Sequence, residues 1–186
     1  MDDPKFLSGQ FLLAMPGIGD PRFEKAVIAM CSHDEDGALG IGLGRIIPRI
    51  HFHDLLRELD IDPGVAPNVA IHQGGPVEPQ RGFLLHSLDW GGQDSLQVSN
   101  RWVLTATLDI LRAIAEGRGP SRWIAALGYA GWGAGQLEAE MCSNGWFATP
   151  GDDNLLYDCD VNSRWAAAFK SAGIDTRLLT AESGNA

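Results

Sequence analysis

Hydrophobic residues fall into short runs along the whole chain, and turn-forming residues separate them. Phe11 to Met15 and Ala26 to Ser32 are two such runs around a turn rich in Pro and Gly, and each is typical of a β-strand. Asp36-Gly37 then predicts a tight hairpin turn, because glycine tolerates the positive φ that such a turn needs. In the strand expected from Leu39 to Arg45, glycines alternate with apolar residues. That strand therefore has one bare face, which indicates the close approach of another segment or a ligand; a packed helix or aromatic ring is the simplest occupant.

Helical spacing follows in four segments. These are His53 to Leu59, a helix capped by Thr105 or Thr107 that ends at Ala115, Gln136 to Ser143, and Ser163 to Ala172. Further strands are expected at Val69 to His72, Phe83 to His86, Trp102 to Thr105, Trp123 to Leu127, around Phe147, and at Leu155 to Tyr157. Strands dominate and short turns join several of them, so we predict an α+β fold with a mixed sheet and three or four helices.

Length and composition favour a single domain over residues 1–186. The chain shows neither a linker-like stretch nor an internal repeat, and a chain of this size buries a substantial core. The residues near the N-terminus do not resemble a secretory signal, and apolar runs stay short of a membrane span. We therefore expect a soluble, cytoplasmic protein that makes no membrane contact.

Charge and cysteine usage narrow the partners further. The formal net charge is −10, which repels phosphate backbones and makes direct nucleic-acid binding unfavourable. Cys31, Cys142 and Cys159 are odd in number and well separated, which favours reduced, buried and unreactive thiols over disulfides or a zinc site. The clusters His51-x-His53 and His33-Asp34-Glu35-Asp36 lack a second cluster at metal-ligand spacing, so no metal and no cofactor are expected.

The most constrained stretch runs from Gly128 to Glu140, with glycines at 128, 131, 133 and 135. We interpret it as a strand-to-helix turn that delivers a helix N-terminus, where free N–H groups suit an anion. It matches neither a dinucleotide-binding nor a P-loop motif. The alternative is structural: Glu138 and Glu140 satisfy the first turn of the helix, while Tyr129 and Trp132 pack into the core.

A second candidate region gathers polar side chains beside sharp turns between Val69 and His86. His72, Gly74-Gly75, Arg81 and His86 could line a cleft. The alternative is that Arg81 pairs with a carboxylate such as Glu78 and that both histidines bond to backbone. Neither region contains a nucleophile elbow or an assembled triad, so no catalytic residue is assigned.

Several segments together resemble the YqgE/AlgH family. These are Phe11-Leu12-Leu13-Ala14-Met15-Pro16 with Asp20-Pro21-x-Phe23, Gly74-Gly75-Pro76-Val77 with Arg81-Gly82-Phe83-x-Leu85-His86, and Leu127-Gly128-Tyr129-Ala130-Gly131-Trp132-x-x-Gly135-Gln136-Leu137-Glu138-x-Glu140 with Asn144-x-Trp146. The match keeps its order over nearly the whole chain, and its last segment is specific.

The resemblance implies a bacterial cytosolic protein with a strongly bent sheet like a partial barrel. It implies little about function, because the family is largely uncharacterised and its label, a transcriptional regulator, rests on a link to the control of polysaccharide synthesis. The chain departs from the family pattern at Gly42-Leu43-Gly44-Arg45-Ile46-Ile47, where Leu-Val-x-Asn-Arg-Pro is usual, and at Gly184-Asn185-Ala186, where Gly-His-Ala is usual. No role of that Asn or Pro, and no catalytic histidine at the C-terminus, carries over.

Three functions follow as hypotheses. The first is a non-enzymatic binding protein with a regulatory role, which acts through an unknown protein or small-molecule partner. The second is an enzyme with an unfamiliar site that uses Arg81, His72 or His86, and Glu138 or Glu140. The third is a regulator that binds DNA directly, which the family label suggests and the charge opposes. The candidate binding residues are Gly74, Gly75, Arg81, His86, Tyr129, Gly131, Trp132, Gly135, Gln136, Glu138 and Glu140.

Overall fold

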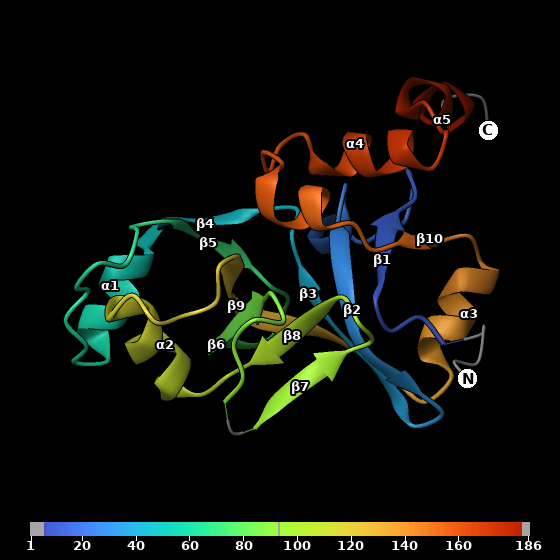
Figure 1. Cartoon of the computed structure of the whole chain (residues 1–186). Coiled ribbons are helices and arrows are strands. Elements are labelled where there is room, and N and C mark those ends of the chain that lie inside the picture. Colours follow the sequence, from blue (N-terminus) through green and yellow to red (C-terminus); the bar gives the residue numbers. More distant parts are fainter. Residues whose placement is uncertain (1–5, 93, 184–186) are drawn as a thin grey trace.

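One curled sheet organises the protein, as the computed structural model in Figure 1 shows. The structure describes residues 6–92 and 94–183, with side chains up to residue 179, so the departure at Gly184-Asn185-Ala186 lies outside it. The strands are β1 Gln10–Ala14, β2 Val27–Asp34, β3 Gly37–Gly42, β4 Ile46–His51, β5 Ala70–Gln73, β6 Val77–His86, β7 Ser95–Val98, β8 Trp102–Thr105, β9 Trp123–Gly133 and β10 Trp146–Pro150. The α-helices are α1 Phe52–Glu58, α2 Leu108–Ala115, α3 Gln136–Cys142, α4 Arg164–Ser171 and α5 Thr176–Ser183. Two short turns of helix complete the chain, η1 Pro21–Phe23 and η2 Asn154–Asp158.

The sheet order is β10-β1-β2-β3-β9-β6-β8-β7, and all of these neighbours are antiparallel. Strand β5 joins the sheet by pairing parallel to β9, and β4 pairs with β5. The long strand β9 therefore connects both halves of the sheet, because it contacts β3, β5 and β6.

Both faces of the central strands are buried, and the alternation of side chains divides them between separate clusters. In β1, Phe11 and Leu13 point into the hollow of the curled sheet, whereas Leu12 and Ala14 face the outer cluster beside α3. In β9, Ala126 faces the hollow and Ala125 faces the cluster beneath α1 and α2. The period of two thus builds one inner core and two outer ones from the same strands.

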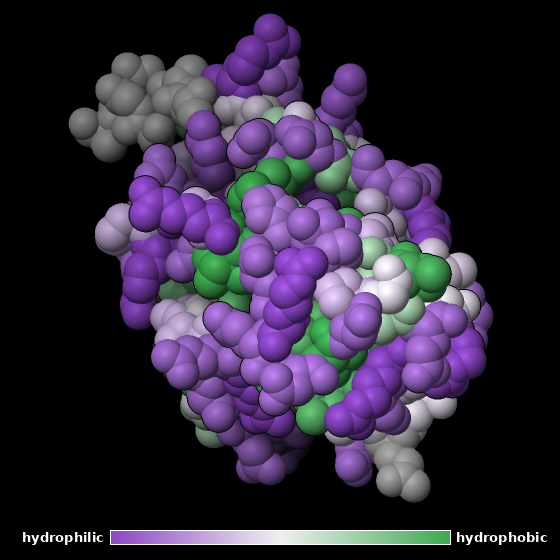
Figure 2. All heavy atoms as spheres, turned by 90° about the vertical axis from the view of Figure 1, so that its left-hand side faces the viewer, coloured by the Kyte–Doolittle hydropathy of each residue, from purple (hydrophilic) through white to green (hydrophobic). Residues whose placement is uncertain are grey.

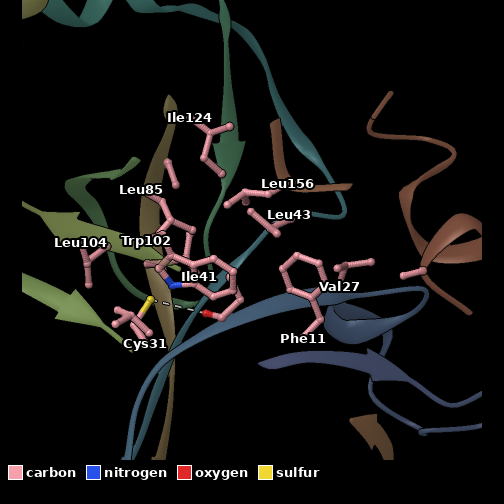
Figure 3. Close-up of a cluster of buried hydrophobic side chains, with 14 of the residues drawn as sticks. Phe11, Val27, Cys31, Ile41, Leu43, Leu85, Trp102, Leu104, Ile124 and Leu156 are labelled. Atoms are coloured by element: carbon pink, nitrogen blue, oxygen red, sulfur yellow. Dashed lines mark hydrogen bonds between the residues drawn. The ribbon is translucent and has the colours of Figure 1, made fainter. Parts of the chain in front are cut away.

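Trp102 fills the middle of the inner core, where Ile41, Leu85 and Leu104 surround it (Figure 3). Its ring stacks on Phe11 with 5.6 Å between ring centroids. A Cβ at Gly151 would lie 2.6 Å from the indole, so the end of β10 packs against β8 without a side chain between them. The two ends of the strand order therefore approach each other, and the sheet takes the shape of a half-barrel.

Four helices cover this sheet, and α5 continues beyond them against α4 (Figure 1). The predicted α+β fold, with a strongly bent mixed sheet and three or four packed helices, is confirmed. In the part of the chain that the structure describes, no helix has the length and apolar character needed to cross a membrane.

The predicted turn from Gly128 to Glu140 is wrong over its first half, because β9 continues to Gly133. Gly131 and Gly133 lie in the ladder opposite Leu39 and Gly37. Only Ala134-Gly135 turns the chain, and α3 starts at Gln136. The glycines serve close strand packing in this segment: a Cβ at Gly128, which has φ +78°, would lie 2.4 Å from the carbonyl oxygen of Gly75.

Two smaller expectations also fail. The residues Leu155 to Tyr157 form part of the helical turn η2, not a strand, because Asp152 accepts a hydrogen bond from the Leu155 N–H and starts a helical path. The three cysteines are free, as expected, but only Cys31 is buried. Burial raises the pKa of the Cys31 thiol to about 12, and the neighbouring Trp102 opposes that shift.

Arg164 is a buried cation at the start of α4, with 2% of its surface exposed. Its Nε donates to the carbonyl of Leu155, and its Nη2 donates to the carbonyls of Leu156 and Cys159. Its Nη1 donates to the Leu43 carbonyl and to His72 Nε2. All five guanidinium donors are therefore used, and they tie η2 and α4 to the end of β3 and to β5.

We expect Arg164→Met to lower the free energy of unfolding by about 3 kcal/mol or more, because it leaves several buried carbonyls without donors. Urea unfolding measures this change. The control is Arg118→Met, which removes an arginine paired with Glu116 on the surface and should cost less than about 1 kcal/mol. Equal losses in the two variants would contradict a structural role for the Arg164 network.

Candidate functional site

A small pocket lies where β2, β3 and the segment between β5 and β6 meet, and we call it the Gly74 pocket. Its lining consists of small and apolar residues with two arginines and one glutamine: Arg22, Phe23, Ala26, Ile28, Gly42, Gly44, Arg45, Gln73, Gly74, Gly75, Pro76 and Ala130. These residues come from segments far apart in the sequence. Of the predicted binding residues, Gly74 and Gly75 lie here.

The glycines of the Gly74 pocket allow three backbones to approach one another. The Gly42 N–H donates to the Gly74 carbonyl at 2.7 Å, and the Gly74 N–H donates to the Leu127 carbonyl at 2.8 Å. A Cβ at Gly74 would lie 2.1 Å from the carbonyl oxygen of Gly128. The bare face predicted for the third strand is thus covered in part by backbone, and not by the helix or aromatic ring expected as the simplest occupant.

The charged side chains that line the Gly74 pocket are Arg22 and Arg45. Arg22 forms a two-pronged ion pair with Asp20, whose shortest N–O distance is 2.7 Å, and this partner lowers the pKa of the Asp20 carboxyl. Arg45 donates through Nη2 to the carbonyls of Pro21 and Glu24, at 3.0 and 3.3 Å. Both guanidinium groups are therefore fixed against the η1 turn.

The predicted residue Glu138 lies in the first turn of α3 and contacts a buried histidine of β2. His33 Nδ1 accepts the Leu7 N–H at 3.0 Å, so the ring proton sits on Nε2 and is donated to Glu138 at 2.6 Å. This bond fastens α3 to the sheet. No signal in the sequence linked these two residues, which are 105 positions apart.

The predicted residues Trp132 and Glu140 form a second link between α3 and the sheet. A carboxylate oxygen of Glu140 accepts the indole N–H groups of Trp132 and Trp146, at 3.4 and 3.2 Å. Glu140 therefore joins β9 to β10, and the expectation that it satisfies the first turn of α3 is wrong, since it lies beyond that turn. Gln136 accepts the Gly133 N–H at 3.0 Å, and Gly135, with φ +75°, precedes the helix.

The predicted residues Arg81, Tyr129 and Gly131 lie on another face of β6 and β9. Arg81 pairs with Glu78 at 3.4 Å and covers the ring of Phe83. Partial burial and then the Glu78 carboxylate raise the pKa of Tyr129. Tyr129 and Gly131 line a shallow depression there, separate from the lining of the Gly74 pocket. The candidate residues thus fall into several places and do not form one site.

The two candidate histidines are buried and bonded. His86 donates from Nδ1 to the Ser87 carbonyl and accepts the Thr105 hydroxyl at Nε2, each at 2.8 Å; burial lowers its pKa. His72 Nδ1 donates to the Ala125 carbonyl at 3.3 Å, which leaves Nε2 to accept the Arg164 donor at 3.2 Å. The alternative that both histidines bond to backbone is confirmed.

A further hollow lies between α1 and α2, on the side of the molecule that Figure 2 faces, where hydrophobic patches show between hydrophilic side chains. Its lining is uncharged and includes Leu55, Leu59, Leu84, Leu108 and Leu111. Within residues 6–92 and 94–183, no group of three or more His, Cys, Asp and Glu side chains is placed to hold a metal ion.

The sequence signal for the Gly74 pocket was incomplete. The Gly74-Gly75 pair was a candidate, but Arg45, Arg22 and Phe23 were not assigned to a site. Arg45 appeared only as the end of an expected strand and at a departure from the family pattern, and its place in the pocket depends on β3 lying beside the segment that follows β5. Asp20-Pro21-x-Phe23 was available only as part of the family resemblance.

Comparisons with known proteins agree on one family. A family model described as AlgH-like matches residues 11–177. A UPF0301 protein of Rhizorhabdus wittichii is 64% identical over 186 residues and covers 100% of both chains, and one of Novosphingobium aromaticivorans is 55% identical over the same span and coverage. The solution structure of the AlgH protein from Pseudomonas aeruginosa has a TM-score of 0.82 at 37% identity, over 97% of this chain and 96% of that one.

The fold is also similar to that of a crystal structure from Corynebacterium diphtheriae, with a TM-score of 0.72 at 23% identity, over 92% of this chain and 90% of that one. At this identity the likeness concerns the fold alone.

Because His72 is buried in its neutral form, we predict that the stability of the protein depends on pH. Burial, and then the Arg164 charge, lower the pKa of His72 from 6.5 to about 4. The unfolded chain therefore takes up the proton first as the pH falls. Neutral His72 therefore contributes about 3 kcal/mol to the free energy of unfolding. This contribution is complete above about pH 6.5 and is lost as the pH falls towards about 4.

Urea unfolding of the wild type and of His72→Gln between pH 7.5 and about pH 4 measures this contribution. We expect the stability difference between the two proteins to shrink as the pH falls, because the variant cannot take up this proton. A difference that stays constant over the range would show that His72 titrates normally in the folded state.

Proposed function

We propose that this chain, which belongs to the AlgH-like family, is a non-enzymatic binding protein with a regulatory role and holds a small ligand in the Gly74 pocket. Its shape and lining suit a ligand: the walls combine apolar side chains with a few fixed polar groups, as small-molecule sites commonly do. The regulatory part of the proposal follows the family label, with the ligand or a protein partner as the signal.

One observation carries the proposal: the segments on which the family resemblance depends meet at this pocket. Phe23 comes from the Asp20-Pro21-x-Phe23 segment, Gly74 and Gly75 from the second segment, and Ala130 from the third. These positions span more than half of the chain. Packing alone could bring two such segments together, but a concave surface lined by all three also offers a place for a ligand.

The enzyme alternative has less support from the geometry. A general acid or base must reach the substrate within hydrogen-bond distance. His86 is fully buried and His72 nearly so, and each ring already uses both nitrogens for other bonds. Arg81 lies on the exposed segment of β6, and Glu140 holds two indole groups on α3.

A ligand screen by thermal melting tests the proposal. We expect one or more members of a broad metabolite panel to raise the Tm of the wild type, because a ligand that binds only the folded state stabilises it. In Ala26→Met, whose larger side chain narrows the Gly74 pocket, the ligand should no longer raise the Tm. The matched control, Ala172→Met at the exposed C-terminal end of α4, should keep it.

The outcomes separate clearly. Shifts that survive in Ala26→Met would place the ligand elsewhere. A wild type that responds to no compound, and that captures no partner in a pull-down, would contradict the binding function.

Direct DNA binding has its own test. A chain with a net charge of −10 should not retard a DNA duplex in a mobility-shift assay at low salt, where even weak phosphate contacts are favoured. Retardation that disappears as salt is added would instead support direct binding to the DNA backbone.

A further inference from the structure

We infer that the ligand of the Gly74 pocket is a small monocarboxylate with a short aliphatic tail, and that Arg45 binds its carboxylate group. This inference rests on the proposed function, because it names the ligand class for the same pocket. Four features lead to it: the charge of the lining, the fixed position of Arg45, the small volume and the apolar wall.

The lining of the pocket is basic in an acidic protein. It contains two arginines and no carboxylate. Asp20 neutralises Arg22 through its two-pronged pair. Among the described residues, no Asp or Glu lies within ion-pair distance of Arg45. Arg45 is therefore the charge that an anionic ligand would meet.

Arg45 is also held in place before any ligand arrives. Its Nη2 bonds to the carbonyls of Pro21 and Glu24, which neutralise none of its charge. A guanidinium group whose position is already fixed loses less freedom when it binds a carboxylate, so more of the interaction appears as affinity. The net charge of the whole chain acts weakly on this contact, because salt screens surface charges beyond about 8 Å at physiological ionic strength.

The size of the pocket limits the ligand. The pocket leaves about 70 Å³ accessible to the centre of a water molecule, and on this scale one water needs roughly 10–15 Å³. A ligand with about as many heavy atoms as a short fatty acid fills this space. Nucleotides, sugars and long acyl chains would extend into solvent.

The wall beyond Arg45 is apolar. Phe23, Ala26, Ile28 and Ala130 line it, so a ligand gains from placing hydrocarbon there, at roughly 25 cal/mol for each Å² removed from water. Inorganic phosphate carries charge and no hydrocarbon. A carboxylate with a short tail matches both parts of the lining.

NMR titration of the ¹⁵N-labelled protein tests the inference with three probes: butyrate, its neutral isostere butyramide, and inorganic phosphate. We expect butyrate to cause saturable shifts in the amide signals of Gly42, Gly44 and Gly74. Butyramide and phosphate should bind at least about tenfold more weakly than butyrate. Butyramide lacks the negative charge, and phosphate lacks the hydrocarbon tail.

Variants of the arginines locate the charge. Arg45→Gln should lower the affinity for butyrate about tenfold, to the affinity of the wild type for butyramide. The affinity of Arg45→Lys should lie between those of the wild type and Arg45→Gln, because lysine keeps the charge but not the paired guanidinium donors. The control Arg49→Gln removes a nearby exposed arginine that does not line the pocket, and it should bind as the wild type does. The amide spectrum of each variant shows whether the protein is folded. If Arg45→Gln does not fold, Arg45→Lys takes its place as the test variant.

The results distinguish the two proposals. Equal binding of butyrate and butyramide, or tighter binding of phosphate, would overturn the monocarboxylate and leave a binding function for the pocket. Undiminished butyrate binding by both Arg45 variants would overturn the role of Arg45. No shift at the pocket with any probe would overturn the inference, and the metabolite screen with Ala26→Met would then decide on the proposed function by itself.

Discussion

The structure depends on the close contact of three backbones at Gly42, Gly74 and Gly128. Hydrogen bonds join β3 to the segment after β5, and that segment to β9, at separations that leave no room for a Cβ at Gly74 or Gly128. Because β9 pairs with both β3 and β6, this contact lies where the two halves of the sheet join and adds to the pairing of β9. The Gly74 pocket lies at this crossing, because Gly42 and Gly74 are part of its lining.

Arg164 secures the same crossing from the inside of the molecule. Its donors reach the Leu43 carbonyl, one residue beyond β3, and His72 of β5, so the C-terminal helices are tied to the strands that build the pocket. A buried guanidinium surrounded by carbonyls is stable only if every donor is used. This requirement fixes the tautomer of His72, and burial lowers its pKa so that the ring is neutral near pH 7.

Polar groups that looked like candidate chemistry mostly hold elements together. Glu138 and Glu140 attach α3 to β2, β9 and β10 through His33 and two tryptophans. The pocket, in contrast, presents Arg45, whose hydrogen-bond partners among the described residues are backbone carbonyls. The difference between these carboxylates and this arginine lies in their partners, and it is the reason for placing a ligand at the Gly74 pocket and not at the start of α3.

The sequence by itself determined the fold class, most strands and helices, and the family, because alternation, helical spacing and turn residues act over short distances. Gly74 and Gly75 were also identified as candidates. Tertiary structure alone decided that the glycines of 128–133 continue a strand, that Arg45 lines one pocket with Phe23 and Ala130, and that Arg164 bonds to His72. Those contacts join residues far apart along the chain. Their geometry follows from which strands become neighbours in a curled sheet, and local sequence patterns do not encode that choice.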